Sequence, residues 1–355
     1  MEYINQPMFT YLGNKRKLLE GIEDVVREVK SILGKDKIRI LDGFTGSTVV
    51  ARMLAGHASE IHSNDLELYS YIAAKCFLER PTSEQTARIA HHLANMNEAA
   101  PLPGFITEMY APKDTNNVQE GERCFFTHEN ALKIDTWRTY IDQKVEEDIR
   151  HWCLCPILIQ MSLRANTYGH FKAFSKRDNI GTFDLCGRRV TDPMSLHRAI
   201  YNPHDCTVFC HNESTNTLLE RLPEGSLDLI YLDPPYNEHE YGAFYFLHNL
   251  VCRNERPVNV NAVTGLPKER TKSAYNNIQA SEAMRHLIAR CVKVSRYTLI
   301  SYNDEGIIGP AGWEAILAPY KVRNFTRTYT RYSSNTKKEA EGRKQVQELL
   351  YLISA

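Results

Sequence analysis

The first eighty residues alternate between amphipathic stretches with helical spacing and short apolar runs that end in polar residues. Short apolar runs bounded by turn residues are typical of buried strands. The order is strand, helix, strand, helix, which predicts a parallel sheet with crossover helices. The expected elements are helices over 14–33, 47–55 and 66–78 and strands over 38–41 and 60–63.

The middle of the chain breaks this rhythm. It predicts helices over 83–98, 128–142 and 145–165, separated by long loops over 101–122 and 166–192. Alternation then resumes, with strands over 206–210, 227–232, 297–301, 322–330 and 346–353, helices over 241–251, 281–294 and one ending at 222, and a loop over 253–280. The pattern therefore predicts an α/β domain in two segments, 1–80 and 205–355, with a mainly helical insertion at 81–204.

Composition limits the class of protein. The chain has 43% hydrophobic and 24% charged residues and a net charge of zero, as in ordinary folded proteins. It has no basic, then apolar, leader at the N-terminus and no apolar run near the roughly 18–20 residues of a membrane span, so we expect a cytoplasmic protein without membrane contact. Its nine cysteines lack framework or zinc-site spacing, so we expect reduced thiols and no metal, with Cys153 and Cys155 in the core.

The strongest chemical signal is Asp233-Pro234-Pro235-Tyr236, which directly follows the apolar run 227–232. Open α/β sheets bind ligands at the carboxyl ends of their strands. A carboxylate and a backbone carbonyl that accept hydrogen bonds from an exocyclic amine localise its lone pair, and prolines fix the direction of that carbonyl. The tyrosine offers a flat face to a base extruded from a duplex. The alternative is a Pro-Pro turn with an incidental aspartate.

Three further motifs accompany this loop. The turn at 42–47 follows the first strand, and its glycines let a ligand lie against the backbone, but it lacks the third glycine of a dinucleotide site, which disfavours a dehydrogenase. Asp65 ends the second strand, where a carboxylate can bind ribose hydroxyls or cap a helix. Lys15 opens a helix against the helix dipole, which indicates that it is held for a ligand.

Together these motifs resemble the alpha group of DNA adenine methyltransferases, which includes the Dam-type enzymes and many modification methylases of type II restriction systems. The similarity includes Tyr11-x-Gly-x-Lys15, the 42–47 turn, Asn64-Asp65 and the Asp-Pro-Pro-Tyr loop, and extends to 300–306 and 329–332. It implies a Rossmann-like fold and methyl transfer from S-adenosylmethionine to N6 of adenine in double-stranded DNA. It also implies a monomer on DNA and functional pairing with a restriction endonuclease of the same specificity.

The resemblance assigns roles to individual residues. Glu213 stands where the family usually has an aspartate that contacts the cofactor adenine. The target adenine is expected to be held by Asp233, Pro234, Pro235 and Tyr236. The cofactor is expected to be bound by Tyr11, Lys15, Asp42, Gly43, Phe44, Gly46, Asp65, Glu213 and Asp233.

Two stretches of this neutral chain are strongly basic. Residues 164–198 carry seven lysines and arginines against three aspartates, interleaved with aromatic side chains, and residues 321–344 carry eight against two glutamates. One such run is often a solvated face, but two around a base-modifying loop favour DNA contact. In the alpha order the insertion is the target-recognition domain. The expected DNA contacts are Arg164, Lys172, Lys176, Arg177, Arg188, Arg189 and Arg331.

Other reactions fit less well. C5-cytosine methylation uses a cysteine nucleophile after proline, and Cys155-Pro156 has the reverse order. RNA and protein-amide methylation usually carry asparagine at the position of Asp233. N4-cytosine methylation uses a related loop, mostly with serine there, and stays an alternative. A catalytically silent DNA-binding regulator on the same fold is the alternative from another class, which the retained Asp233, Tyr236, Asp65 and Lys15 disfavour.

Overall fold

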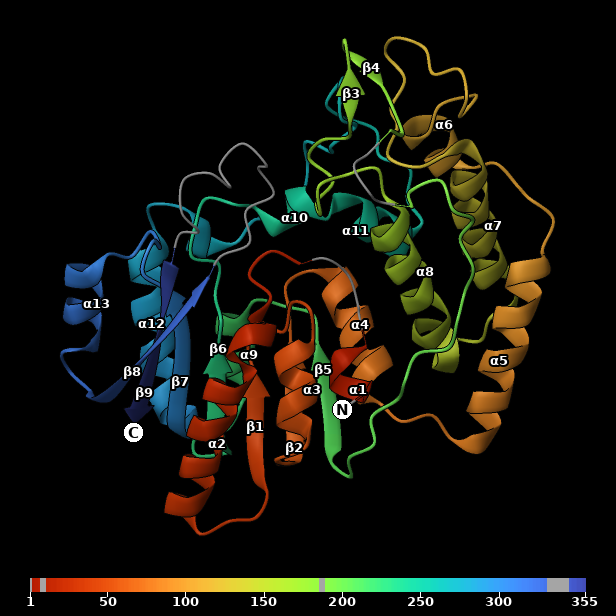
Figure 1. The fold of residues 1–355 in the computed structure, drawn as a ribbon. Coiled ribbons are helices and arrows are strands. Elements are labelled where there is room, and N and C mark those ends of the chain that lie inside the picture. Colours follow the sequence, from red (N-terminus) through yellow and green to blue (C-terminus); the bar gives the residue numbers. More distant parts are fainter. Residues whose placement is uncertain (1, 7–10, 185–188, 331–344) are drawn as a thin grey trace. The chain divides into compact units, whose positions relative to one another are not determined.

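The computed structural model describes residues 2–6, 11–184, 189–330 and 345–355, which divide into two compact units. Unit 1 consists of Met1–Gly13, Lys75–Asn202 and Tyr241–Thr271, and unit 2 of Asn14–Ala74, Pro203–Glu240 and Lys272–Ala355. Figure 1 labels the α-helices and strands of both units. Nearly all of the expected insertion at 81–204 lies in unit 1, which also takes in 241–271 from beyond the Asp-Pro-Pro-Tyr loop.

Unit 2 is built on a seven-stranded sheet in the order β5-β2-β1-β6-β7-β9-β8. The first five strands are parallel, and β9 runs antiparallel to both β7 and β8. This mixed, mostly parallel sheet confirms the α/β class, and all seven expected strands are present. They are β1 (Ile38–Asp42), β2 (Ala58–Asn64), β5 (Thr207–His211), β6 (Leu227–Leu232), β7 (Ser295–Asn303), β8 (Lys321–Thr330) and β9 (Gln345–Ser354).

Helices cover this sheet. The helix expected over 14–33 ends at Leu33, because Gly34 takes a left-handed conformation (φ 64°) and its N–H donates to the carbonyls of Lys30 and Ser31. The helices are η1 (Lys15–Leu18), α2 (Leu19–Leu33), α3 (Val49–Ala55), α4 (Leu68–Leu78, which runs on into unit 1), α9 (Thr215–Arg221), η3 (Ala274–Asn276), α12 (Ala280–Val294) and α13 (Pro310–Leu317). The sequence analysis did not predict η3 and α13.

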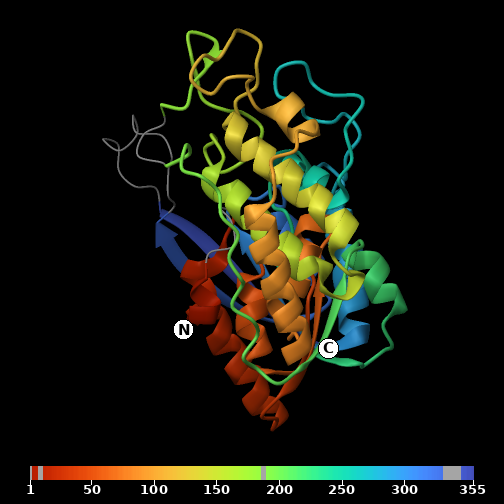
Figure 2. The same ribbon diagram turned by 90° about the vertical axis from the view of Figure 1, so that its right-hand side faces the viewer.

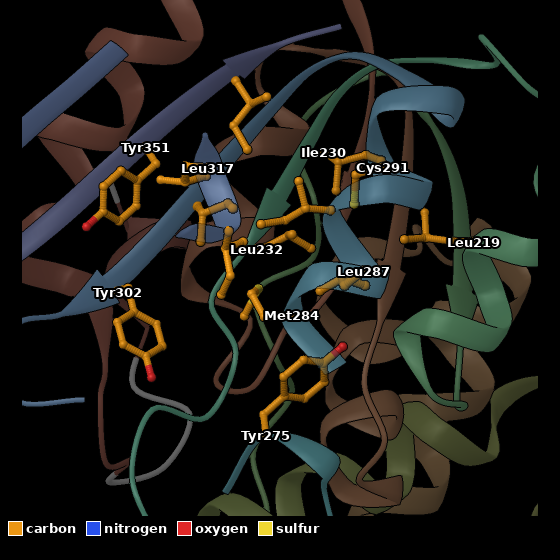
Figure 3. Close-up of a cluster of buried hydrophobic side chains, with 14 of the residues drawn as sticks. Leu219, Ile230, Leu232, Tyr275, Met284, Leu287, Cys291, Tyr302, Leu317 and Tyr351 are labelled. Carbon is orange, nitrogen blue, oxygen red and sulfur yellow. The ribbon is translucent and has the colours of Figure 1, made fainter. Parts of the chain in front are cut away.

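The apolar core on one face of the sheet joins β6, β7 and β9 to α9, α12 and α13 (Figure 3). Alternate residues of each strand point to this face. On β9 these are Leu349, Tyr351 and Ile353. Polar side chains in the opposite phase therefore belong to the other face, where the site described below is found.

Unit 1 is mainly helical, and α5, α7 and α8 lie side by side in it (Figures 1 and 2). Cys153 and Cys155 are buried on α8, as predicted. No helix in the described part of the chain is long and apolar enough to span a membrane. The elements are α1 (Glu2–Asn5), α5 (Ser83–Glu98), α6 (Phe105–Tyr110), α7 (His128–Lys144), η2 (Glu147–Ile149), α8 (Arg150–Arg164), β3 (Lys176–Arg177), β4 (Ile180–Gly181), α10 (Tyr241–Phe244) and α11 (Phe246–Arg253).

Helix α6 corrects the prediction of a continuous loop over 101–122. Its first turn is capped by a residue distant in sequence: the carboxylate of Asp135 on α7 accepts hydrogen bonds from the backbone N–H groups of Gly104, Ile106 and Thr107 (2.9, 3.1 and 2.8 Å). A carboxylate there satisfies N–H groups that have no partner within the helix. The local sequence could not predict this helix, because Pro101 and Pro103 just before it indicate a loop and the capping residue Asp135 is distant in the sequence.

Candidate active site

The site lies in unit 2, at the carboxyl ends of β1 and β6. These parallel strands are neighbours where the strand order changes direction, the usual ligand-binding point of open α/β sheets. Asp42 is in register with Tyr231, and the N–H of Gly43 donates to the Tyr231 carbonyl at 2.9 Å. The 42–47 turn and the Asp233–Tyr236 loop therefore emerge side by side.

Two glycines shape the 42–47 turn for different reasons. A Cβ on Gly43 would lie 2.9 Å from side-chain atoms of both Leu232 and Thr215, so the turn packs too closely there for any side chain. Gly46 has φ 48°, in the left-handed region that favours glycine. The expectation that Gly43, Phe44 and Gly46 line the cofactor stays a prediction; the ring of Phe44 packs edge-on against Tyr275 at 5.3 Å.

Asn64 joins the loops at the ends of three strands, a role that the sequence analysis missed. Its side-chain amide donates to the Gly43 carbonyl (3.3 Å), the Glu213 carbonyl (3.1 Å) and Thr215 Oγ1 (3.2 Å). Thr215 in turn donates to the Gly43 carbonyl at 2.7 Å. The signal available in the sequence was an amide residue beside Asp65 at a strand end.

Asp65 also stabilises the turn. Its Oδ2 accepts the N–H of Gly46 at 2.7 Å and its Oδ1 accepts the N–H of Glu67 at 2.9 Å. Burial raises the pKa of Asp65 to about 6, although these backbone donors oppose the shift. Hydrogen bonds from the Ser70 side chain and the Leu66 N–H also lower this pKa. The predicted ribose contact stays a prediction.

Lys15 is the centre of the charged part of the site. Its ammonium lies 2.7 Å from Asp233 Oδ1 and 3.1 Å from Glu348 Oε1, and its side chain is only 5% exposed. Glu348 lies on β9, is fully buried and also accepts a hydrogen bond from Ser301 Oγ on β7. The structure thus joins the predicted Lys15 and Asp233 and adds two residues, Glu348 and Ser301, that the sequence analysis missed.

A signal for Glu348 was present in the sequence. In the apolar strand over 346–353 it is in phase with Leu350 and Leu352, so strand alternation alone turns it toward a buried face. An ionisable residue at an inward-facing strand position is rarely fully buried unless it is paired. What the sequence could not give was its partner.

Burial and the neighbouring charges shift the ionisation of this cluster. Burial raises the pKa of Asp233 to about 6; Lys15 opposes that shift and Glu348 adds to it. Burial alone would lower the pKa of Lys15, but Asp233 and then Glu348 outweigh it and raise that pKa well above the ordinary value. Lys15 therefore stays charged, while the Asp233 carboxyl titrates closer to neutrality than a free aspartate.

Asp42 is a buried carboxyl group with few hydrogen-bond donors around it. Burial, then the charges of Asp233 and Asp65, raise its pKa well above the ordinary value. Its Oδ1 accepts a long hydrogen bond from the N–H of Phe44 (3.4 Å), and its buried Oδ2 has no hydrogen-bond partner within the described residues. Unsatisfied buried acceptors are rare in native proteins, so Asp42 is suited to a cationic or hydrogen-bonding ligand.

Tyr236 lies beside the charged cluster. The ammonium of Lys15 is 5.7 Å from its ring centroid, and the ring contacts Tyr302 edge-on at 6.2 Å. The Tyr236 carbonyl accepts the N–H of Ile307 at 2.7 Å, which ties the Asp-Pro-Pro-Tyr loop to the segment after β7. The loop is thus held at both ends, by Lys15 at Asp233 and by Ile307 at Tyr236.

Two predicted cofactor contacts have other partners. Glu213, which follows β5, forms an ion pair with Arg221. Tyr11 belongs to unit 1, where its ring stacks on those of Tyr241 and Tyr245 at 5.1 Å each. The cofactor roles of Glu213 and Tyr11 stay predictions.

The predicted DNA contacts that the structure describes lie in unit 1. Lys172, Lys176 and Arg177 are exposed, whereas Arg164 is partly buried and donates to the Arg189 carbonyl, with Asp192 nearby at 3.7 Å. Arg188 and Arg331 fall outside the residues that the structure describes. Arg189 is exposed and lies 4.0 Å from Asp192.

A mostly parallel seven-stranded sheet, with an Asp-Pro-Pro-Tyr loop at the carboxyl edge, is compatible with a methyltransferase. The comparison with known families is more specific: the profile of the D12 class N6 adenine-specific DNA methyltransferases matches residues 11–308, and the chain belongs to this family. It is an adenine-specific DNA methyltransferase.

Individual relatives agree with this assignment. The chain is 28% identical to the type II methyltransferase M.CviAII of Paramecium bursaria Chlorella virus 1, over 97% of each chain. It is 25% identical to the type II methyltransferase M.NlaIII of Neisseria lactamica, over 92% of each. It is 26% identical to the modification methylase StsI of Streptococcus sanguinis, over 97% of this chain but 51% of that protein, so it spans about half the length of StsI.

Proposed function

We propose that the protein modifies duplex DNA at a specific sequence within a restriction-modification system, transferring a methyl group from S-adenosylmethionine to N6 of adenine. The observation that carries the proposal is the buried contact between Lys15 and Asp233 at the carboxyl edge of the sheet. It fixes a carboxylate next to two prolines and a tyrosine, the groups that an exocyclic amine requires. The names of the relatives, type II methyltransferases and modification methylases, support this biological setting.

Asp233 and Pro234 orient the amine in this proposal. Lys15 donates to Oδ1 of Asp233, which leaves Oδ2 to accept one N–H of the adenine amine, while the Pro234 carbonyl accepts the other. The nitrogen lone pair is then no longer delocalised into the ring. A nitrogen that gains a fourth substituent becomes acidic, and a carboxylate whose pKa is about 6 is well placed to take that proton.

The residues around the 42–47 turn fit the cofactor. S-adenosylmethionine supplies an electrophilic methyl carbon on a positively charged sulfur, and it also carries an ammonium group. Asp42 offers a buried, unpartnered carboxylate oxygen to a cation. Gly43 and Gly46 leave two positions of the turn without a side chain, and Asp65, which already fixes the Gly46 N–H, would meet the ribose.

The nature of the modified base tests this function. Incubation with isotopically labelled S-adenosylmethionine and unmethylated duplex DNA, followed by hydrolysis, should yield labelled N6-methyladenine. Labelled N4-methylcytosine would establish the alternative substrate. DNA that is retained on a filter but never labelled would identify a silent DNA-binding protein.

The hairpin of β3 and β4 is the part of unit 1 that we expect to read DNA. Asp178 and Asn179 form its two-residue turn, both with positive φ (50° and 66°), as type I′ hairpin turns require. The base of the hairpin packs tightly: a Cβ on Gly181 would lie 2.3 Å from Cys124 Sγ. Lys176 and Arg177 stay exposed on it, and a two-stranded ribbon fits the major groove.

Substituting these two residues should weaken DNA binding through phosphate or base contacts. We expect Lys176→Ala and Arg177→Ala each to lower the slope of log affinity against log salt by about one, since each removes about one ionic contact. Arg177 forms an ion pair with Asp184 at 3.3 Å, and both side chains are exposed. Such surface pairs are weak, so Arg177 can bind a phosphate in place of Asp184. The matched control is Lys144→Ala, an exposed lysine at the end of α7. Hairpin variants with the parent's salt slope would exclude the hairpin from the DNA interface.

A further inference from the structure

Glu348 is a second carboxylate on Lys15, although Asp233 alone already neutralises the ammonium. The two carboxylate oxygens that contact Lys15 come from separate elements of unit 2, one from the loop after β6 and one from β9. Burying an ion costs several kcal/mol unless its partners compensate. A leucine, like its neighbours in phase on β9, would avoid that cost, so the charge at this position calls for a role other than stability.

The geometry gives Glu348 one such role. Lysine has a flexible four-carbon stem and three equivalent donors, so a single carboxylate leaves the ammonium free to rotate and shift. Oε1 of Glu348 holds the ammonium at 3.1 Å from β9, and Ser301 Oγ donates to the same oxygen. The ammonium is therefore fixed by two elements of the sheet, and its contact with Oδ1 of Asp233 is short, at 2.7 Å.

We propose that Glu348 is a positioning residue for methyl transfer: by holding Lys15 against one oxygen of Asp233, it keeps the other oxygen directed at the adenine amine. This inference rests on the role proposed above for Asp233. Glu348 itself contacts neither substrate nor cofactor in this scheme. It acts through Lys15.

The negative charge of Glu348 also bears on how Asp233 titrates. The charged and titratable groups that act on Asp233 are Lys15 from η1, Asp42 from β1, Tyr231 from β6 and Glu348 from β9. Of these, Lys15 favours the charged form of Asp233 and Glu348 disfavours it, while Asp233 itself raises the pKa values of Asp42 and Tyr231. Removal of the Glu348 charge should therefore lower the pKa of Asp233.

Glutamine at this position separates charge from shape. Its carbonyl oxygen can accept the same two hydrogen bonds, from Lys15 and Ser301. Its amide nitrogen takes the place of Oε2, which has no hydrogen-bond partner among the residues that the structure describes. Glu348→Gln thus removes the charge and keeps the anchor, whereas Glu348→Ala removes both.

The experiment measures kcat and KM of the full chain on duplex DNA from pH 5 to 9, with the affinities for DNA and S-adenosylmethionine. We expect Glu348→Ala to lower kcat by about 10- to 100-fold, as misplacement of a catalytic group does, with both affinities within about twofold of the parent. Glu348→Gln should keep most of the plateau rate, and the acid limb of its kcat profile should move to lower pH, because that limb reports groups in the enzyme–substrate complex.

Asp228→Asn is the matched control. Asp228 is a buried carboxylate on β6, paired with Lys35 at 2.7 Å at the opposite end of the strand from Asp233. It should lose stability without moving the acid limb. If Glu348 were only structural, Glu348→Gln would likewise lower stability without moving the acid limb of the kcat–pH profile. An acid limb at the same pH in Glu348→Gln as in the parent would therefore overturn the proposal.

Two further outcomes separate this inference from the proposed function. Parent kcat in both Glu348 variants, with an inactive Asp233→Ala, would overturn the positioning role and leave the function intact. An active Asp233→Ala would overturn the role of Asp233 and the inference with it. If Glu348→Ala fails to fold, Glu348→Gln still decides through its pH profile.

Discussion

Asp233→Ala should lose methylation almost completely, with kcat lower by about 10³-fold, the upper range for the removal of one oriented electrostatic contact in an active site. The reason is local. Without the carboxylate, the amine of the target adenine keeps its lone pair delocalised into the ring, and no side chain next to it can accept its proton. Sequence-selective DNA binding should change little. The measurement is single-turnover transfer of labelled methyl groups to duplex DNA at saturating enzyme, beside filter binding.

A second substitution refines this result. Asp233→Asn can still accept a hydrogen bond from the amine but cannot take its proton, so an intermediate rate would indicate that Asp233 both orients the amine and acts as a base. The fold should survive either change because Lys15 retains Glu348 as a partner at 3.1 Å. If Asp233→Ala methylates at near the parent rate, the assigned role is wrong.

Lys15→Met should be the most destabilising single change in the site. It leaves the fully buried Glu348 and the partly buried Asp233 next to each other without a cation, and removing one partner of a buried ion pair costs about 3–5 kcal/mol. The free energy of unfolding, measured by urea denaturation at pH 8, should fall by that amount. The control is Lys35→Met, which should cost far less. The Lys35 side chain is 39% exposed, and its partner Asp228 still accepts a hydrogen bond from the Arg39 N–H at 2.9 Å.

The loss in Lys15→Met should shrink as the pH falls. Burial and Glu348 already raise the pKa of Asp233 above its unfolded value, and without Lys15 nothing opposes them. A carboxyl whose folded pKa exceeds its unfolded pKa stabilises the fold when it is protonated, and this stabilisation is lost as the pH rises through the folded value. The variant should therefore be closer to the parent at pH 5 than at pH 8. An equal loss at both values would show that Asp233 and Glu348 do not repel each other in the folded state.

The position of the site followed from the sequence because its determinants are local. A six-residue stretch that is apolar except for Asp228 predicts a buried strand, and the polar residues that follow such a strand emerge at the carboxyl edge of the sheet. The glycine turn after β1 and the acidic residue after β2 follow from the same rule. This is why the sequence alone is enough to place Asp42, Asp65 and Asp233 at one edge.

The tertiary structure decided which of these groups touch. Lys15 and Glu348 come from opposite ends of the chain, and their contact depends on the antiparallel register of β9 against β7, in which Glu348 lies opposite Asn303. A shift of one residue would turn the Glu348 side chain to the other face. The spacing of residues along the sequence does not determine that register.

The same holds for unit 1. Helical periodicity located its long helices, but α6 depends on a cap from Asp135, and 241–271 joins this unit although the sequence places it after the catalytic loop. The sequence by itself determined the strands, the long helices and the reactive motifs, since each depends on neighbours a few residues away. Only the folded chain decided the buried Lys15 cluster, the long-range cap and the extent of each unit, because these come from contacts between segments that are distant in the sequence.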